Sequence, residues 1–114
     1  MIKYTELESI FLDVDITIHE YNIETNDLID LPYVVYIATD GNAFEADGIN
    51  YFKTLSVGLA IIDETMNFAL QRKIEEVFSA HYVSFDKTIN FDDDARLYTI
   101  TYNFEVIDDG ANKH

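Results

Sequence analysis

The 114-residue chain has no cysteine, no tryptophan, one proline and only four glycines. The lack of cysteine excludes a disulfide framework, a thiolate metal site and a thiol nucleophile. Four scattered glycines do not make a glycine-rich phosphate loop. No stretch approaches the roughly 18 apolar residues of a membrane-spanning helix. The first residues, MIKYTELES, contain no apolar signal core, so we expect synthesis in the cytoplasm and no membrane partner.

Positive charge is scarce as well. Seven Lys and Arg stand against 22 Asp and Glu, which gives a net charge of −15. The few cations are scattered, so the sequence has no basic stripe for nucleic-acid binding, and its field repels nucleic acid and anionic membranes. Three meanings of the charge stay open: solubility alone, a surface that imitates DNA, or the lining of a passage through which a polyanion slides.

Catalytic and metal-binding patterns are not found in the sequence. The histidines, His19, His81 and His114, are far apart, and no ligand spacing joins them. Asp92–Asp94 is the densest acidic run, but it lacks the register of a calcium-binding loop. With 22 acids, chance carboxylate pairs are expected, so a small enzyme with such a pair is only an alternative. We therefore expect no catalytic site, no metal and no cofactor.

Hydrophobic periodicity predicts two helices and five strands. The helices are expected over residues 4–12 and 64–80, where apolar residues recur at helical spacing. Their expected capping residues are Thr5 with Glu8 for the first helix and Asp63 or Thr65 for the second. Apolar runs and alternation predict strands over residues 13–23, 33–38, 55–61, 82–91 and 97–107.

This order of elements predicts a single α+β domain over residues 1–107, with a mostly antiparallel sheet and two helices packed on one face. Residues 108–114 have no periodicity and are expected to form a flexible C-terminal tail. The segment 33–38 is apolar on both faces, which predicts a central strand covered by helix on one side and by a partner or a loop on the other. In segment 55–61, large residues alternate with small ones, so a helix or another subunit can approach the small side.

Tyrosine is abundant for so small a core. Its apolar ring and polar tip suit protein interfaces, which is one interpretation; the other is that the rings straddle the edge of the core. The residues concerned are Tyr33, Tyr36, Tyr51, Tyr82, Tyr98 and Tyr102.

Two Asp-Gly pairs follow the most hydrophobic strand within LPYVVYIATDGNAFEADGINYFK. Asp40-Gly41 and Asp47-Gly48 each offer the positive φ that a tight turn needs, so both are predicted turns. We expect the segment between Thr39 and Asn50 to project as a stiff finger. An ordinary connection between strands is the alternative.

The pattern as a whole resembles the tail-completion proteins of long-tailed bacteriophages and prophages, the head-tail joining or tail-terminator proteins. The resemblance covers Tyr4 to Ile107 and is most specific at PYVVY, at the Ala46-Asp47 pair with Tyr51, and at the final strand LYTITYNFEVI. The chain departs from the family in being strongly acidic, whereas members of that family are richer in lysine.

The resemblance implies a structural virion protein and not an enzyme. Such proteins assemble as a homo-oligomeric ring, commonly a hexamer, on the finished tail tube at the head-tail junction. The ring contacts the tail-tube protein and the head connector proteins, and DNA passes through its hole only as cargo.

On this hypothesis the finger lies at an interface or in the lumen, where repeated carboxylates would repel the DNA backbone. The residues predicted for the finger are Asp40, Phe44, Glu45, Asp47 and Tyr51. The residues predicted for subunit contact are Tyr33, Tyr36 and Gly58. The alternative function is an acidic DNA mimic that inhibits a nucleic-acid-binding protein through carboxylates spaced like phosphates.

Overall fold

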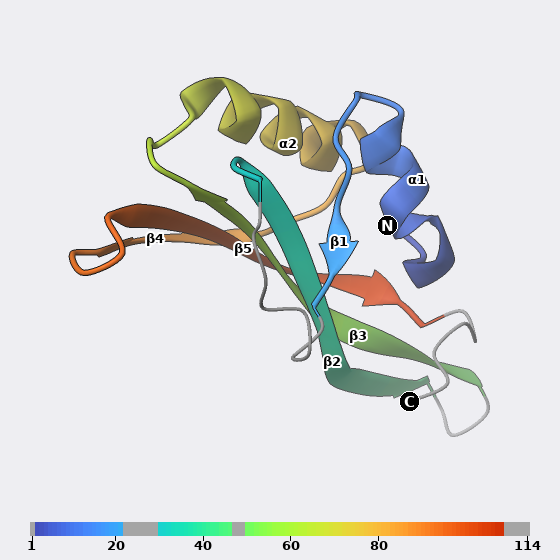
Figure 1. The fold of residues 1–114 in the computed structure, drawn as a ribbon. Coiled ribbons are helices and arrows are strands. Elements are labelled where there is room, and N and C mark those ends of the chain that lie inside the picture. The colour runs from blue at the N-terminus through green and yellow to red at the C-terminus, as the bar shows by residue number, and fades with distance from the viewer. Residues whose placement is uncertain (1, 22–29, 47–49, 109–114) are drawn as a thin grey trace.

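A computed structural model of the chain describes residues 2–21, 30–46 and 50–108, with residues 40–46 and 50–53 described by their backbone alone. The predicted fold class is confirmed: the domain is α+β, with a five-stranded, mostly antiparallel sheet in the order β1-β2-β3-β5-β4. Both helices lie on the same face of this sheet (Figure 1). The elements are η1 (Tyr4–Glu6), α1 (Leu7–Leu12), β1 (His19–Glu20), β2 (Tyr33–Ala46), β3 (Asn50–Asp63), α2 (Phe68–Ala80), β4 (Asp86–Asp92) and β5 (Leu97–Ile107).

The core lies between the helices and the sheet. β3 occupies the middle of the sheet, and its larger alternate residues are buried under the helices, as the alternation predicts. The same alternation in β5 buries Ile100, Tyr102, Phe104 and Val106. The ring of Phe78 in α2 packs among the rings of Phe11 in α1, Phe85 in the following loop, and Tyr102 and Phe104 in β5.

The second helix begins later than predicted, at Phe68, and its cap is Asn67 rather than Asp63 or Thr65. The Asn67 side chain accepts a hydrogen bond from the Leu70 backbone N–H at 3.2 Å. Asp63 holds the capping side chain in place, because its carboxylate accepts a hydrogen bond from the Asn67 side-chain amide at 2.9 Å. The stripe of Ile74, Val77 and Phe78 that predicted the helix is buried.

The first helix also differs at its start. The Glu6 carboxylate accepts from the Lys3 backbone N–H at 2.9 Å, so the predicted pairing of Thr5 with Glu8 is wrong. Glu8 instead reaches the sheet, where it accepts a hydrogen bond from the Tyr36 hydroxyl. A tertiary contact to this carboxylate therefore takes precedence over a local cap.

The predicted strand over residues 13–23 forms only at His19–Glu20 among its described residues, and it runs parallel to β2. Backbone N–H groups of Asp15 and Ile16 donate to Leu12 and Phe11, which closes a turn directly after α1. The alternation of apolar and polar residues that predicted this strand reflects burial, because Ile16 and Ile18 are both buried in the core. Alternating burial does not require pairing in a sheet.

The predicted tight turn at Asp40-Gly41 is wrong, since both residues lie within β2. The pairing of β2 with β3 shifts there: Asp40 pairs with Leu55, but Ala43 pairs with Lys53, so β2 holds one extra residue. Glycine is suited to such a bulge. β3 pairs with β5 only from Thr54 onward. Before Thr54, β3 still pairs with β2, as far as the pair of Asn50 with Ala46. We call this two-stranded extension, residues 41–46 with 50–53, the hairpin arm.

Candidate functional site

The hairpin arm contains the residues predicted for the finger. Phe44 pairs with Phe52, and Glu45 pairs with Tyr51, in the antiparallel register. Asp40 precedes the bulge, and Asp47 lies outside the described residues. The predicted projecting segment is therefore a continued strand pair in its described part, rather than a loop between two tight turns.

The three residues predicted for subunit contact do not share one face of the sheet. A Cβ on Gly58 would face Ile37 and Asn103, on the side away from the helices, which we call the open face. Tyr33 lies on the same side, and its ring stacks on His19 with 5.0 Å between ring centroids. Tyr36 points the other way and is only 4% exposed, so its side chain is part of the core and not of the open face.

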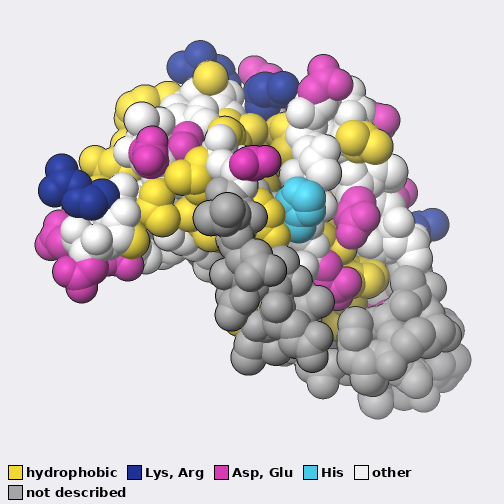
Figure 2. All heavy atoms as spheres, viewed as in Figure 1, with side chains coloured by type: hydrophobic (Ala, Val, Ile, Leu, Met, Phe, Trp, Pro, Cys, Tyr) yellow, Lys and Arg dark blue, Asp and Glu magenta, His cyan; other side chains and the backbone are white. Residues whose placement is uncertain are grey.

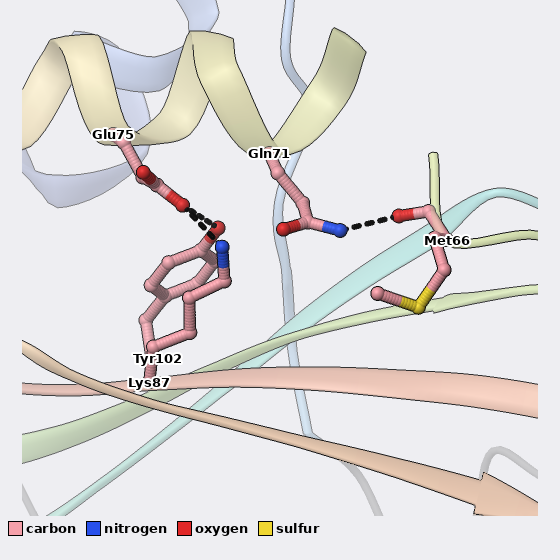
Figure 3. Close-up of polar contacts among 5 residues, drawn as sticks. All are labelled: Met66, Gln71, Glu75, Lys87 and Tyr102. Carbon is pink, nitrogen blue, oxygen red and sulfur yellow. Dashed lines mark hydrogen bonds and ion pairs between the residues drawn. The ribbon is translucent and has the colours of Figure 1, made fainter. Parts of the chain in front are cut away.

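Two buried tyrosines tie the helices to the sheet. The Tyr36 hydroxyl in β2 donates to Glu8 Oε2 of α1 at 2.5 Å. The Tyr102 hydroxyl in β5 donates to Glu75 Oε2 of α2 at 2.8 Å, and Lys87 Nζ of β4 lies 2.7 Å from the same oxygen (Figure 3). These contacts stabilise the fold, and for Tyr36 and Tyr102 they replace the interface role that the sequence suggested.

These contacts raise the pKa of the two tyrosines and lower the pKa of Glu75. Burial raises the pKa of the Tyr36 and Tyr102 phenols far above the usual range, and their carboxylate partners raise it further. The hydrogen bond from Lys87 lowers the pKa of Glu75, burial opposes this, and the hydrogen bond from Tyr102 lowers it further.

Alkaline pH should therefore unfold the protein through these two tyrosines. A phenol with a raised folded-state pKa contributes stability that is complete below the unfolded value of about 10 and is lost as the pH rises above it. We expect ultraviolet absorbance to show two of the eight tyrosines ionising only together with the loss of circular dichroism. Ionisation of all eight in the intact fold would contradict this. A Tyr36→Phe/Tyr102→Phe variant is the control, because it lacks the late step.

The open face of the sheet is uncharged over its centre. Register and burial assign it the outward side chains of β2, β3 and β5, and small or apolar residues predominate on β2 and β3. A hollow of about 320 Å³ lies here, and Tyr21, Val35 and Ile37 form part of its lining with Gly58, Ala60, Thr101 and Asn103. The outward positions are Tyr33, Val35, Ile37, Ser56, Gly58, Ala60, Ile62, Thr99, Thr101 and Asn103.

The two edges of the sheet are unlike each other. β4 forms one edge, and all seven of its residues are exposed. At the other edge β1 covers β2 only at Val35 and Tyr36, and no described segment pairs with the outer side of β2 from Ile37 onward. Unpaired strand edges are templates for pairing with another chain. The sequence patterns did not predict which strands would form the edges of the sheet, because this depends on strand order.

Acidic side chains are spread over the visible surface, with Lys and Arg groups set apart from one another (Figure 2). In the Asp92–Asp94 run, the Asp92 carboxylate accepts from the backbone N–H groups of Asp94 and Ala95, so it shapes the β4–β5 turn. Within the described part of the chain, no group of three His, Cys, Asp or Glu residues could hold a metal ion. No helix described in the structure is long and apolar enough to span a membrane.

Comparison of the chain with protein-family models, with curated proteins and with solved structures gives no match. The geometry supports an α+β domain with an exposed β4 edge, an outer side of β2 that no described segment covers from Ile37 onward, and an open face that is uncharged at its centre.

Proposed function

We propose that the chain is a tail-completion protein of a long-tailed bacteriophage or prophage. It forms a homo-oligomeric ring, commonly six-fold in the family that the sequence resembles, at the end of the tail tube. The ring contacts the tail-tube protein and the head connector at the head-tail junction of the virion. DNA passes through the hole as cargo, and the acidic surface discourages it from adhering.

The observation that carries this proposal is a pair of unlike edges: β4 is fully exposed, and no described segment pairs with the outer side of β2 from Ile37 onward. A closed ring needs a head-to-tail contact, in which one surface of a subunit binds a different surface of the next. Strand pairing between β4 of one subunit and β2 of its neighbour satisfies this requirement. The middle of β4, Thr88–Phe91, carries no charge, so it lacks the charged side chains that protect many edge strands.

Mass in solution tests the ring. Light scattering behind a sizing column should show a species of about six times the 13.2 kDa subunit mass, and raising the salt should favour it by screening the −15 charge of each subunit. A strict monomer across all protein and salt concentrations would count against the ring and favour the DNA mimic.

An Asn90→Glu variant tests the edge. The added carboxylate lies in the exposed middle of β4, and we expect it to shift the subunit concentration at half assembly upward by about tenfold. Ser79→Glu on α2 is the matched control, because it is exposed and adds the same charge away from the edge. Equal effects of the two substitutions would contradict assembly through β4.

The arrangement of described carboxylates weighs against the DNA mimic. A mimic needs carboxylates along one exposed face, yet the centre of the open face has none, and Glu75 on the helix side is paired with Lys87.

A further inference from the structure

The open face is too poor in charge for a surface that only meets water. The uncovered face of an antiparallel sheet is usually polar, and about a quarter to a third of surface residues are charged. None of the ten outward positions from Tyr33 to Ile37, Ser56 to Ile62 and Thr99 to Asn103 is charged, although the chain has 29 charged residues in total. Ile37 on this face is 48% exposed.

The shape of the open face is a shallow groove along β3. Gly58 and Ala60 form a low floor, while Val35 and Ile37 on β2 and Thr101 and Asn103 on β5 stand on either side. Neighbouring strands lie about 4.8 Å apart, so β2 and β5 are separated by roughly 10 Å. The side chains of the two walls fill part of this spacing, so the groove admits a row of side chains from one face of a helix.

The charge around the groove is negative. Asp86 pairs with Asn103, so its carboxylate stands at one end of the groove. Among cations with described side chains, Arg72 and Lys73 lie on α2, and Lys87 binds Glu75 on the helix side. Arg96 lies in the β4–β5 turn, and Lys3 lies directly before η1. Electrostatic complementarity therefore calls for a positively charged occupant, whereas the open face of a second copy would bring its own Asp86 carboxylate against the same surface.

We propose that the open face binds an amphipathic helix of a partner protein, with its apolar stripe seated along β3 and Lys or Arg on its flanks. The helix would cover the uncharged positions and place a Lys or Arg near Asp86. This binding does not depend on the ring, because the groove lies on the face of the sheet and not on its edges.

Synthetic helices test the proposal with the full chain. One labelled peptide of about 18 residues carries a leucine stripe flanked by lysine, a second has glutamate in place of lysine, and a third has the leucine and lysine residues scrambled so that no stripe forms. We expect fluorescence anisotropy to show the striped lysine peptide binding about tenfold more tightly than either of the others.

Neutral substitutions locate the binding without changing the net charge. In Gly58→Val the new Cβ would lie 3.5 Å from Asn103 Oδ1 and 3.8 Å from Ile37 Cγ2, which is ordinary contact, while the rest of the side chain fills the groove. Ile37→Ser removes an exposed apolar wall and guards against failure of the first variant to fold. Both should weaken binding of the striped lysine peptide about tenfold. Phe68→Ser, on the helix side at a residue 64% exposed, should leave it unchanged.

Three outcomes would overturn the proposal. Equal binding of the striped and scrambled lysine peptides would show attraction to charge alone. Binding that is insensitive to both Gly58→Val and Ile37→Ser would place the peptide elsewhere. Self-association lost in these two variants, without peptide binding to the parent chain, would assign the groove to a second copy.

Discussion

Phe78→Ala should lower the free energy of unfolding by about 3–5 kcal/mol, the range for truncating a buried phenylalanine. Phe78 is fully buried, and its ring centroid lies 4.7 Å from that of Phe104 and 4.9 Å from that of Phe85. It also meets the edge of the Phe11 ring, so one side chain joins both helices, the loop after α2 and the sheet. The cavity would therefore lie where these elements meet in the core.

Urea unfolding followed by circular dichroism measures this loss. A domain of this kind has a total stability of about 5–15 kcal/mol, so at the lower end of that range the variant should be close to unfolded at room temperature. Phe68→Ala is the matched control on the same helix, because Phe68 is 64% exposed and its truncation should cost less than about 0.5 kcal/mol. A loss below about 1.5 kcal/mol for Phe78→Ala would mean that the core closes around the cavity.

Tyr102→Phe should cost about 1.5 kcal/mol at neutral pH. The substitution keeps the buried ring and removes only the hydroxyl that donates to Glu75 at 2.8 Å. Hydrogen bonds to charged partners contribute about 1.5–3 kcal/mol, and the lower value applies because the Glu75 side chain is 35% exposed and water can replace the lost donor.

The loss should depend on pH with a definite sign. The folded-state pKa of Glu75 is lowered, first by Lys87 and then by Tyr102, so its contribution is present above the unfolded carboxyl pKa of about 4.3 and is lost as the pH falls through the folded value. We therefore expect the difference between parent and Tyr102→Phe to shrink between pH 7 and about pH 3. A difference of the same size at both pH values would show that the hydroxyl does not act through the Glu75 carboxylate.

Tyr98→Phe is the control for this substitution. Tyr98 lies on the same face of β5, its ring packs on Phe91, and its hydroxyl has no hydrogen-bond partner among the described residues. Its replacement should change stability by less than about 0.5 kcal/mol at either pH.

Periodicity was a reliable guide where burial repeats along one element. The alternation in β3 and β5 and the stripe of α2 predicted the buried residues correctly, because each pattern records contact with a single core. The same signal misled at residues 13–23, where Ile16 and Ile18 are buried without a strand partner. Turn residues misled at Asp40-Gly41, where pairing with β3 extends through a bulge.

The sequence likewise predicted some features of the candidate surfaces and missed others. The small residues of β3 indicated a face that another element could approach, and the structure places Gly58 and Ala60 in the floor of the groove. The abundance of tyrosine indicated interfaces, but Tyr36 and Tyr102 are core residues whose hydroxyls reach Glu8 and Glu75. Nothing in their spacing reveals these partners, which are 28 and 27 residues away.

Residue order alone was sufficient for the α+β class, the two amphipathic helices and the strongly acidic character, since each depends on composition or on neighbours within a few turns of chain. Strand order, the parallel pairing of β1, the exposed edge strand β4 and the groove beside Gly58 emerged only when distant segments came together. These features depend on which strands become neighbours, and that choice is made by packing across the whole core rather than by any local pattern.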